Sequence, residues 1–213
     1  MTRGIKLFSL FFPILMLGQS RVGEWKSYPS FLNVRETIEV GDLLVSATSG
    51  GILLYNREAL SFETVTNIDG LVETDLSVIA EDGNGHLWLG GAAPNGTVQI
   101  YDLAKRQSVK IFNFDLWEVT AFAVSDSVVC AAYSKDGQWG ILEFVMQDGE
   151  FSYRQIYNPS DESLESISGL ALRGDFLFAA TNLGLFSGDY KKFILNYPQN
   201  WTSIPEFAGK SMT

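Results

Sequence analysis

The chain has 213 residues, of which 46% are hydrophobic and 13% aromatic, so it holds enough apolar material for a sizeable core. Its 25 Asp and Glu residues outnumber 15 Lys and Arg residues and give a formal net charge of −10. A surface this acidic repels phosphate backbones, so nucleic acid is excluded as an expected partner.

Residues 1–20 have the layout of a secretory signal peptide. Arg3 and Lys6 precede about eleven mostly apolar residues, 7–17, and small or polar residues follow. That apolar stretch is too short for a spanning helix, which needs about 20 residues. We therefore expect a secreted protein of the periplasm or bacterial cell surface without a membrane span. An uncleaved membrane anchor is the alternative.

Residues 24–28 alternate apolar and polar side chains, a pattern that predicts a lone strand before the first repeat. Such a strand can complete the last blade of a closed propeller. A loose edge strand is the alternative.

The clearest unit of the chain spans residues 69–102. It contains three short segments rich in strand-forming residues, 76–80, 86–90 and 97–101. The first two are separated by Asp82-Gly83-Asn84-Gly85, whose glycine and asparagine residues tolerate the positive φ angles of tight hairpins. Turn signals at this spacing predict an antiparallel sheet.

The same unit recurs along the chain. A glycine precedes the third strand of each copy at Gly51, Gly96, Gly140 and Gly184, at intervals of 45, 44 and 44 residues. A strand-rich period of this length is typical of β-propeller blades. The fold class is therefore predicted as all-β, a β-propeller with four recognisable blades of about 44 residues. The blades span residues 24–197, with the individual blades at 34–67, 68–113, 114–157 and 158–197.

Residues 198–213 follow the fourth repeat and are predicted to be the start of a further blade or a truncated tail. Four blades are the lower limit for a propeller, so we expect the chain to be part of a larger one. A compact ring of four blades is the competing interpretation.

Successive strands of a blade run in opposite directions, so turns between second and third strands should share one face with the connections between blades. Acidic residues and two tryptophans gather on this inter-blade face. The candidate binding residues are Asp69, Glu73, Asp75, Asp115, Trp117, Asp136 and Trp139. A tryptophan ring flanked by carboxylates and amides is suited to carbohydrate. Solvated turn carboxylates and tryptophans packed in the core are the plainer alternatives.

Catalytic and metal sites receive little support from the sequence. The single histidine, His86, argues against histidine-activated nucleophiles and multi-histidine metal sites. Cys130 is the only cysteine, so no intrachain disulfide forms, and its apolar surroundings predict a buried thiol. No glycine-rich phosphate-binding motif is present, and we expect no cofactor and no bound metal. A calcium loop at residues 82–85 is an alternative that lacks the usual later glutamate.

The motifs of the second repeat, residues 69–71, 76–79, 85–90 and 101–102, resemble the two-component-regulator propeller repeat. Residues 25–28, 48–52 and 55, continuing to the turn at 69–71, resemble more specifically the N-terminal propeller of PorZ-type proteins of the type IX secretion system. The third repeat departs from the pattern, because it lacks the Asp-Gly-Leu turn and the tryptophan of its second strand.

The resemblance implies a non-enzymatic binding or scaffold module at the cell surface. PorZ-type proteins attach secreted cargo to lipopolysaccharide, so the expected partners are proteins or cell-surface polysaccharide. An extracytoplasmic polysaccharide sensor is the first alternative. A propeller glycoside hydrolase or lyase is the second, because such enzymes need two acids at a defined separation.

Overall fold

The computed structural model describes residues 29–162 and 164–212. The predicted signal peptide and the predicted strand at residues 24–28 lie outside the described residues. The described chain is all-β and forms four four-stranded antiparallel sheets, each built from four strands in chain order. Its helices are three single-turn 3-10 segments: η1 (Asn67–Asp69), η2 (Pro198–Asn200) and η3 (Pro205–Phe207). No helix among the described residues is long and apolar enough to cross a membrane.

The strands follow the predicted repeat. The first sheet contains β1 (Val34–Val40), β2 (Leu43–Thr48), β3 (Gly51–Asn56) and β4 (Ser61–Val65). The second contains β5 (Leu76–Glu81), β6 (His86–Gly91), β7 (Gly96–Asp102) and β8 (Gln107–Leu116). The third contains β9 (Glu118–Val124), β10 (Val128–Lys135), β11 (Gln138–Gln147) and β12 (Glu150–Tyr157). The fourth contains β13 (Ile167–Arg173), β14 (Phe176–Thr181), β15 (Gly184–Asp189) and β16 (Trp201–Ser203).

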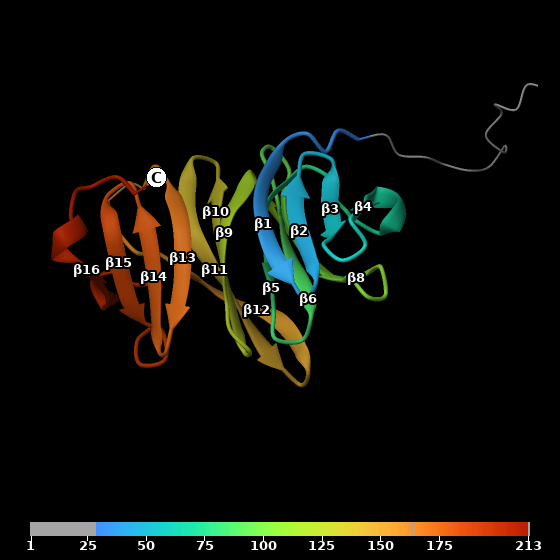
Figure 1. Cartoon of the computed structure of the whole chain (residues 1–213). Helices are drawn as coiled ribbons and strands as arrows, with labels where there is room; N and C mark the ends of the chain where they lie inside the picture. The colour runs from blue at the N-terminus through green and yellow to red at the C-terminus, as the bar shows by residue number, and fades with distance from the viewer. Residues whose placement is uncertain (1–28, 163, 213) are drawn as a thin grey trace, which may run out of the picture.

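The sheets stand side by side in chain order, as the colours of Figure 1 show. The first strand of each sheet contacts that of the next, so β1, β5, β9 and β13 form the inner row of a propeller-like arrangement. Among the described residues β1 has no comparable contact with β13, so the four sheets form an open row there.

The core consists of three apolar layers, one between each pair of neighbouring sheets. The middle layer centres on Trp88, which is fully buried and lies against the ring of Phe151 at a centroid distance of 5.0 Å. Cys130 is buried in the layer between the third and fourth sheets, as predicted. Burial raises the pKa of its thiol well above the ordinary value, and the neighbouring Glu143 raises it further.

Two blade boundaries differ from the predicted ones. The outer strand of the second sheet, β8, continues to Leu116, three residues beyond the predicted end of that blade at residue 113. The outer strand of the fourth sheet, β16, lies at residues 201–203, within the segment predicted to be a tail or a further blade. This strand has only three residues and follows a proline-containing turn, so it carries no alternating pattern for sequence analysis to detect.

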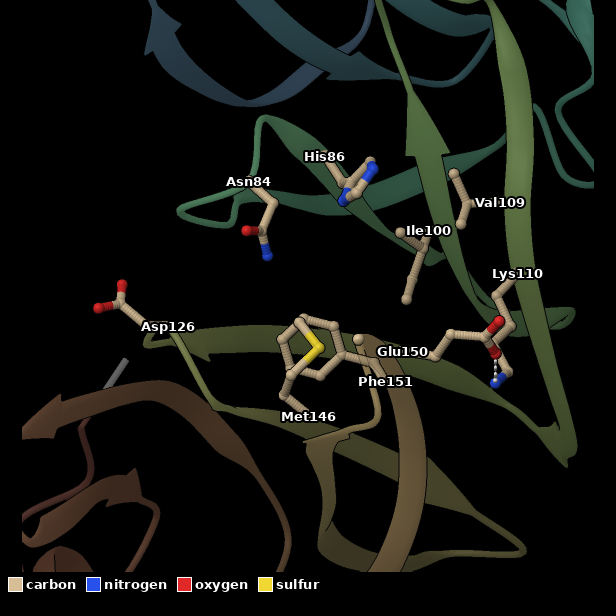
Figure 2. Close-up of a pocket in the computed structure, with 10 residues that line it drawn as sticks. Asn84, His86, Ile100, Val109, Lys110, Asp126, Met146, Glu150 and Phe151 are labelled. Atoms are coloured by element: carbon tan, nitrogen blue, oxygen red, sulfur yellow. Dashed lines mark hydrogen bonds and ion pairs between the residues drawn. The ribbon is translucent and has the colours of Figure 1, made fainter.

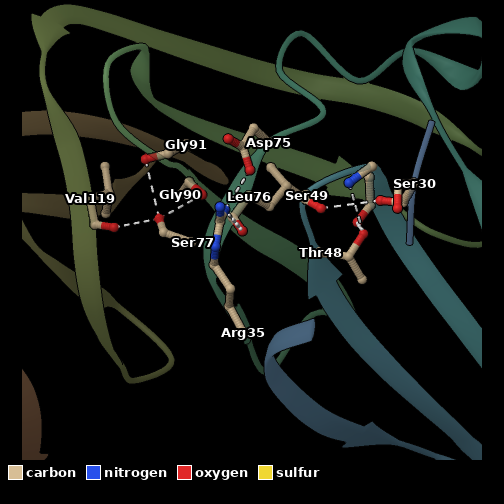
Figure 3. Close-up of polar contacts among 12 residues, drawn as sticks. Ser30, Arg35, Thr48, Ser49, Asp75, Leu76, Ser77, Gly90, Gly91 and Val119 are labelled. Atoms are coloured by element: carbon tan, nitrogen blue, oxygen red, sulfur yellow. Dashed lines mark hydrogen bonds and ion pairs between the residues drawn. The ribbon is translucent and has the colours of Figure 1, made fainter. Parts of the chain in front are cut away.

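Neighbouring sheets are also joined by hydrogen bonds from their inner strands. The Glu36 carboxylate accepts from the Ile79 backbone N–H at 2.8 Å. The Ser77 hydroxyl donates to the Val119 carbonyl, as Figure 3 shows. The Thr120 hydroxyl donates to the Ile167 carbonyl at 2.7 Å. These bonds satisfy backbone groups that no sheet ladder pairs and fix each blade against the next.

Candidate functional site

The connection between β4 and β5 carries Asp69, Glu73 and Asp75 of the predicted site. Asp69 closes the 3-10 turn η1, where its carboxylate accepts the Thr66 backbone N–H at 2.9 Å in a capping box. Gly70 follows with a φ of 95°, which ends the turn. The Asp69 carboxylate is therefore engaged in folding its own connection.

Two side chains of β7 hold this connection against the second sheet. The Gln99 side chain donates to the Gly70 carbonyl at 2.9 Å and accepts from the Val72 N–H at 3.0 Å. The Tyr101 hydroxyl donates to the Asp69 carbonyl at 2.9 Å. Burial raises the pKa of Tyr101, and the charge of Asp69 adds to the effect. The connection is thus a fixed part of the blade.

Asp75 forms an ion pair across the first two sheets. The Arg35 guanidinium lies 2.5 Å from the Asp75 carboxylate and also donates to the Leu76 carbonyl at 2.8 Å. Figure 3 shows Arg35 of β1 reaching these two acceptors. Glu73 is half-buried nearby in the same connection. This half of the predicted site is largely occupied by contacts within the protein.

Asp115 lies near the end of β8, and Trp117 is the single residue that connects β8 of the second sheet to β9 of the third. The Asp115 carboxylate is fully exposed and lies 4.0 Å from the Lys135 ammonium. The Trp117 side chain is 54% exposed, while its backbone N–H donates to the Ser134 carbonyl at 2.8 Å. The backbone of this corner is fixed, and the indole ring is presented to solvent.

Asp136 and Gly137 form the two-residue turn between β10 and β11, with φ angles of 50° and 74°. Two positive φ angles match the hairpin turn that fits the twist of its strands, so Asp136 is an exposed turn residue. Trp139 follows on β11 and packs partly against the layer between the third and fourth sheets. The packing interpretation of Trp139 therefore has support.

Trp139 also lines a polar hollow of about 280 Å³. The hollow lies between the β10–β11 turn and the β12–β13 connection, so it opens on the predicted inter-blade face. Its other lining residues are Gln138, Asn158, Ser160, Asp161, Glu162 and Leu164. Two carboxylates, two amides and a hydroxyl beside a tryptophan offer both donors and acceptors.

The structure thus divides the predicted residues into two groups. Asp69, Glu73 and Asp75 lie in the connection that enters the second sheet, whereas Asp115, Trp117, Asp136 and Trp139 lie around the end of the third sheet. Ser134 of β10 lies between the two tryptophans along the sheet. It pairs with Glu118, the residue after Trp117, on one side and with Trp139 on the other. Of the residues that line the hollow, only Trp139 was among the candidate binding residues, and the candidates did not include Gln138, Asp161, Glu162, Asn158 and Ser160. The only signal for the last two was their place in a connection on the expected face.

The Asp82 turn is explained by hairpin hydrogen bonds. The buried Asp82 carboxylate accepts from the Asn84 N–H at 2.8 Å, the His86 N–H at 3.1 Å and the Trp88 indole N–H at 3.2 Å. Its oxygens are therefore committed to holding Trp88 in the core. Among the residues that the structure describes, no group of three or more His, Cys, Asp or Glu side chains is arranged to hold a metal ion.

Comparisons with known proteins report on the fold. No protein-family model and no curated protein matches the chain. Two similar solved structures are the N-terminal domain of Nup159 (17% identity, 70% of this chain and 39% of that chain, TM-score 0.49) and the computationally designed Ika8 protein (14% identity, 84% and 51%, TM-score 0.61). This chain therefore spans about half or less of the length of either structure. The likeness to Ika8, together with the four antiparallel sheets, shows that the chain has a propeller-like all-β fold.

Proposed function

We propose that this chain is a non-enzymatic binding module that takes a carbohydrate in the hollow beside Trp139. The observation that carries the proposal is the lining of this hollow, in which Gln138, Asn158, Asp161 and Glu162 lie beside Trp139. Sugar rings have C–H surfaces that pack on aromatic rings and hydroxyls that need donors and acceptors at their rim. Indole, amide and carboxylate groups together meet both needs.

The ligand class follows from the resemblance to PorZ-type proteins and from the chemistry of the hollow. A polysaccharide or lipopolysaccharide of the bacterial surface fits a shallow, polar hollow that is open to solvent. The chain then acts as an exported binding or scaffold component, in the periplasm or at the cell surface, that holds this polymer or a protein attached to it. Polysaccharide sensing by a longer regulator is the alternative and uses the same hollow.

We also propose that the four sheets belong to a larger propeller. The Ser168 hydroxyl on β13 donates to the Met212 carbonyl at 2.6 Å, in the manner of Ser77 and Thr120 toward the next blade. Residues 207–208 lie against Gly184, where a Cβ atom would stand 2.5 Å from the Phe207 carbonyl oxygen. The segment after β16 therefore follows the path of an inter-blade connection and supports a further blade beside β13.

The test measures binding of polysaccharide chains released from lipopolysaccharide by titration calorimetry. Glu162→Gln and Trp139→Phe keep the fold and should weaken binding, and Trp139→Ala should weaken it by about tenfold or more, a loss of about 1.4 kcal/mol. Trp117→Ala is the matched control, because this exposed tryptophan does not line the hollow. We expect it to leave the affinity unchanged.

Two results would contradict the proposal. Equal losses in Trp117→Ala and Trp139→Ala would place the ligand elsewhere on this face. Release of new reducing ends from the polysaccharide, abolished by changing one carboxylate, would identify an enzyme and remove the non-enzymatic assignment.

A further inference from the structure

A second cavity lies between the outer parts of the second and third sheets, on the face opposite the Trp139 hollow. Its volume is about 530 Å³, the size of a small-molecule site. It opens among the β5–β6, β9–β10 and β11–β12 hairpins, as Figure 2 shows. We call it the hairpin cavity. Nothing in the proposed function uses it.

The floor of the hairpin cavity is apolar. Ile100 of β7, Met146 of β11 and Phe151 of β12 supply this surface. Phe151 is only 4% exposed and is held from below by the edge-on contact with Trp88. Methionine adapts its shape to a bound group at little cost. The floor therefore combines a rigid aromatic residue with one adaptable side chain, which suits an aromatic or aliphatic body.

Rigid hairpins position the polar rim. Asp148 and Gly149 form a two-residue turn with φ angles of 51° and 85°, which fixes Glu150 at the mouth. Lys110 of β8 reaches Glu150 at 3.4 Å across the two sheets. On the other side, His86 turns its Nδ1 toward the buried Asp82 carboxylate at 3.5 Å. Preformed walls lower the entropic cost of binding.

The charge of the rim selects the ligand. Lys110 and Glu150 compensate one another, which leaves the exposed carboxylate of Asp126 as the excess charge at the opposite end. Asp126 sits on a turn closed by the Ser125 N–H, which donates to the Val128 carbonyl at 2.9 Å. Asn84 lines the same end and adds an amide oxygen. A positive group placed here meets a carboxylate in a protein whose net charge is −10.

We infer that the hairpin cavity binds a small amphipathic cation, with its apolar body on Met146 and Phe151 and its ammonium group at Asp126 and Asn84. An equivalent wedge between the first and second sheets has about 340 Å³ and is crossed by the Arg106–Glu63 ion pair. That wedge is also lined by the Asn56 amide and the exposed Glu81 carboxylate, so it is the competing site for the same ligand, and the experiment must distinguish the two.

The experiment titrates the ¹⁵N-labelled chain with 2-phenylethylamine, 2-phenylethanol and phenylacetate and follows backbone amide shifts. We expect saturable shifts for the amine at the amides of Asn84, His86 and Gly149, with a Kd of about 1 mM or below. The neutral alcohol should bind about fivefold more weakly and the anion not measurably, because one exposed ion pair contributes up to about 1 kcal/mol.

Three variants locate the site. Asp126→Asn should reduce the affinity for the amine to that for the alcohol, and Met146→Trp should abolish binding of both by filling the cavity. Leu103→Trp, which fills the equivalent wedge, should leave both affinities unchanged.

The amide shifts of the unmodified protein locate the binding site even where a variant does not fold. Saturable shifts confined to the equivalent wedge, or none at about 10 mM amine, would overturn the site. Equal affinities for the amine and the alcohol would overturn the assignment of a cation. Loss of saccharide binding in Trp139 variants leaves this site unaffected, so the two proposals can fail independently.

Discussion

At the residue scale, several side chains that the sequence assigned to ligand binding instead stabilise the local fold. Asp69 caps a 3-10 turn, and Asp75 pairs with Arg35 across two sheets. Asp82 shows the same principle in the core, where one carboxylate satisfies three N–H donors, including that of Trp88. An acidic residue in a turn can therefore either stabilise the fold or bind a ligand. Composition does not separate these two roles, and only the contacts of the carboxylate distinguish them.

Asp102 provides a pH prediction at this scale. Lys105 donates to its carboxylate through both its backbone N–H and its ammonium, each at 2.8 Å, and these bonds lower the pKa of Asp102 from its ordinary value of 3.8. A carboxylate whose pKa is lower in the folded protein than in the unfolded chain stabilises the fold at pH values above its ordinary pKa. This stabilisation is lost as the pH falls through the pKa of the folded protein. We expect Asp102→Asn to lower the free energy of unfolding at pH 7 and to lower it less below about pH 4.

Urea unfolding of both proteins at pH 7 and pH 3 measures this difference. Asp148→Asn is the matched control, because Asp148 is an exposed turn residue with a φ of 51° that asparagine also adopts. A destabilisation by Asp102→Asn that is the same at both pH values would show that the charge of Asp102 is not the cause.

At the scale of strands and sheets, the recurring glycines have a steric reason. Gly51 and Gly184 begin β3 and β15 with φ angles of 123° and 128°, which favour glycine. A Cβ atom would stand 2.2 Å from the Val65 carbonyl oxygen at Gly51 and 2.5 Å from the Phe207 carbonyl oxygen at Gly184. At Gly51, Gly96 and Gly184 the glycine period therefore marks where the third strand begins and another part of the backbone passes close to it. Gly140 differs, because it lies inside β11 and a Cβ atom there would meet the Tyr133 side chain.

The bonds between inner strands predict how neighbouring sheets are coupled. Thr120→Val keeps the shape of the side chain and removes the O–H donor to the Ile167 carbonyl. We expect a loss of about 1 kcal/mol in the free energy of unfolding, the net value of one hydrogen bond. The amides of β13 should also exchange faster, because this strand loses its link to β9.

Hydrogen exchange measured strand by strand tests the coupling, and Thr64→Val on the exposed outer strand β4 is the control. Faster exchange in all four sheets of the Thr120 variant, with no preference for β13, would indicate general destabilisation and contradict a specific link.

On the scale of the whole molecule, the first and fourth sheets each have a neighbour on one face only (Figure 1). Exposed aromatic residues lie on both end sheets: Phe62 is 66% exposed beside Tyr55, and Phe176 is 46% exposed beside Phe178. Inside the row, the corresponding space is filled by apolar layers. The two end sheets therefore resemble blades without their next neighbour and support the proposal of a larger propeller.

The end sheets lead to a prediction about association. Unpaired apolar sheet faces and edges promote contact between molecules. We expect Phe62→Glu combined with Phe176→Glu to reduce self-association in sedimentation velocity at high protein concentration while leaving the melting temperature nearly unchanged. Ile68→Glu combined with Val72→Glu, two exposed changes between β4 and β5, controls for the same added negative charge. An equal reduction in this control would exclude the end sheets as the contact surface.

The sequence by itself determined the all-β class, the four repeats and most strands, because alternation, turn residues and the glycine period are local properties of the chain. It did not determine β16, whose three residues carry no pattern, nor the end of β8 at Leu116. Only the tertiary structure separated the two groups of predicted site residues and formed the Trp139 hollow and the hairpin cavity. These features depend on the angle at which neighbouring sheets diverge, which is set by packing between residues about 40 positions apart.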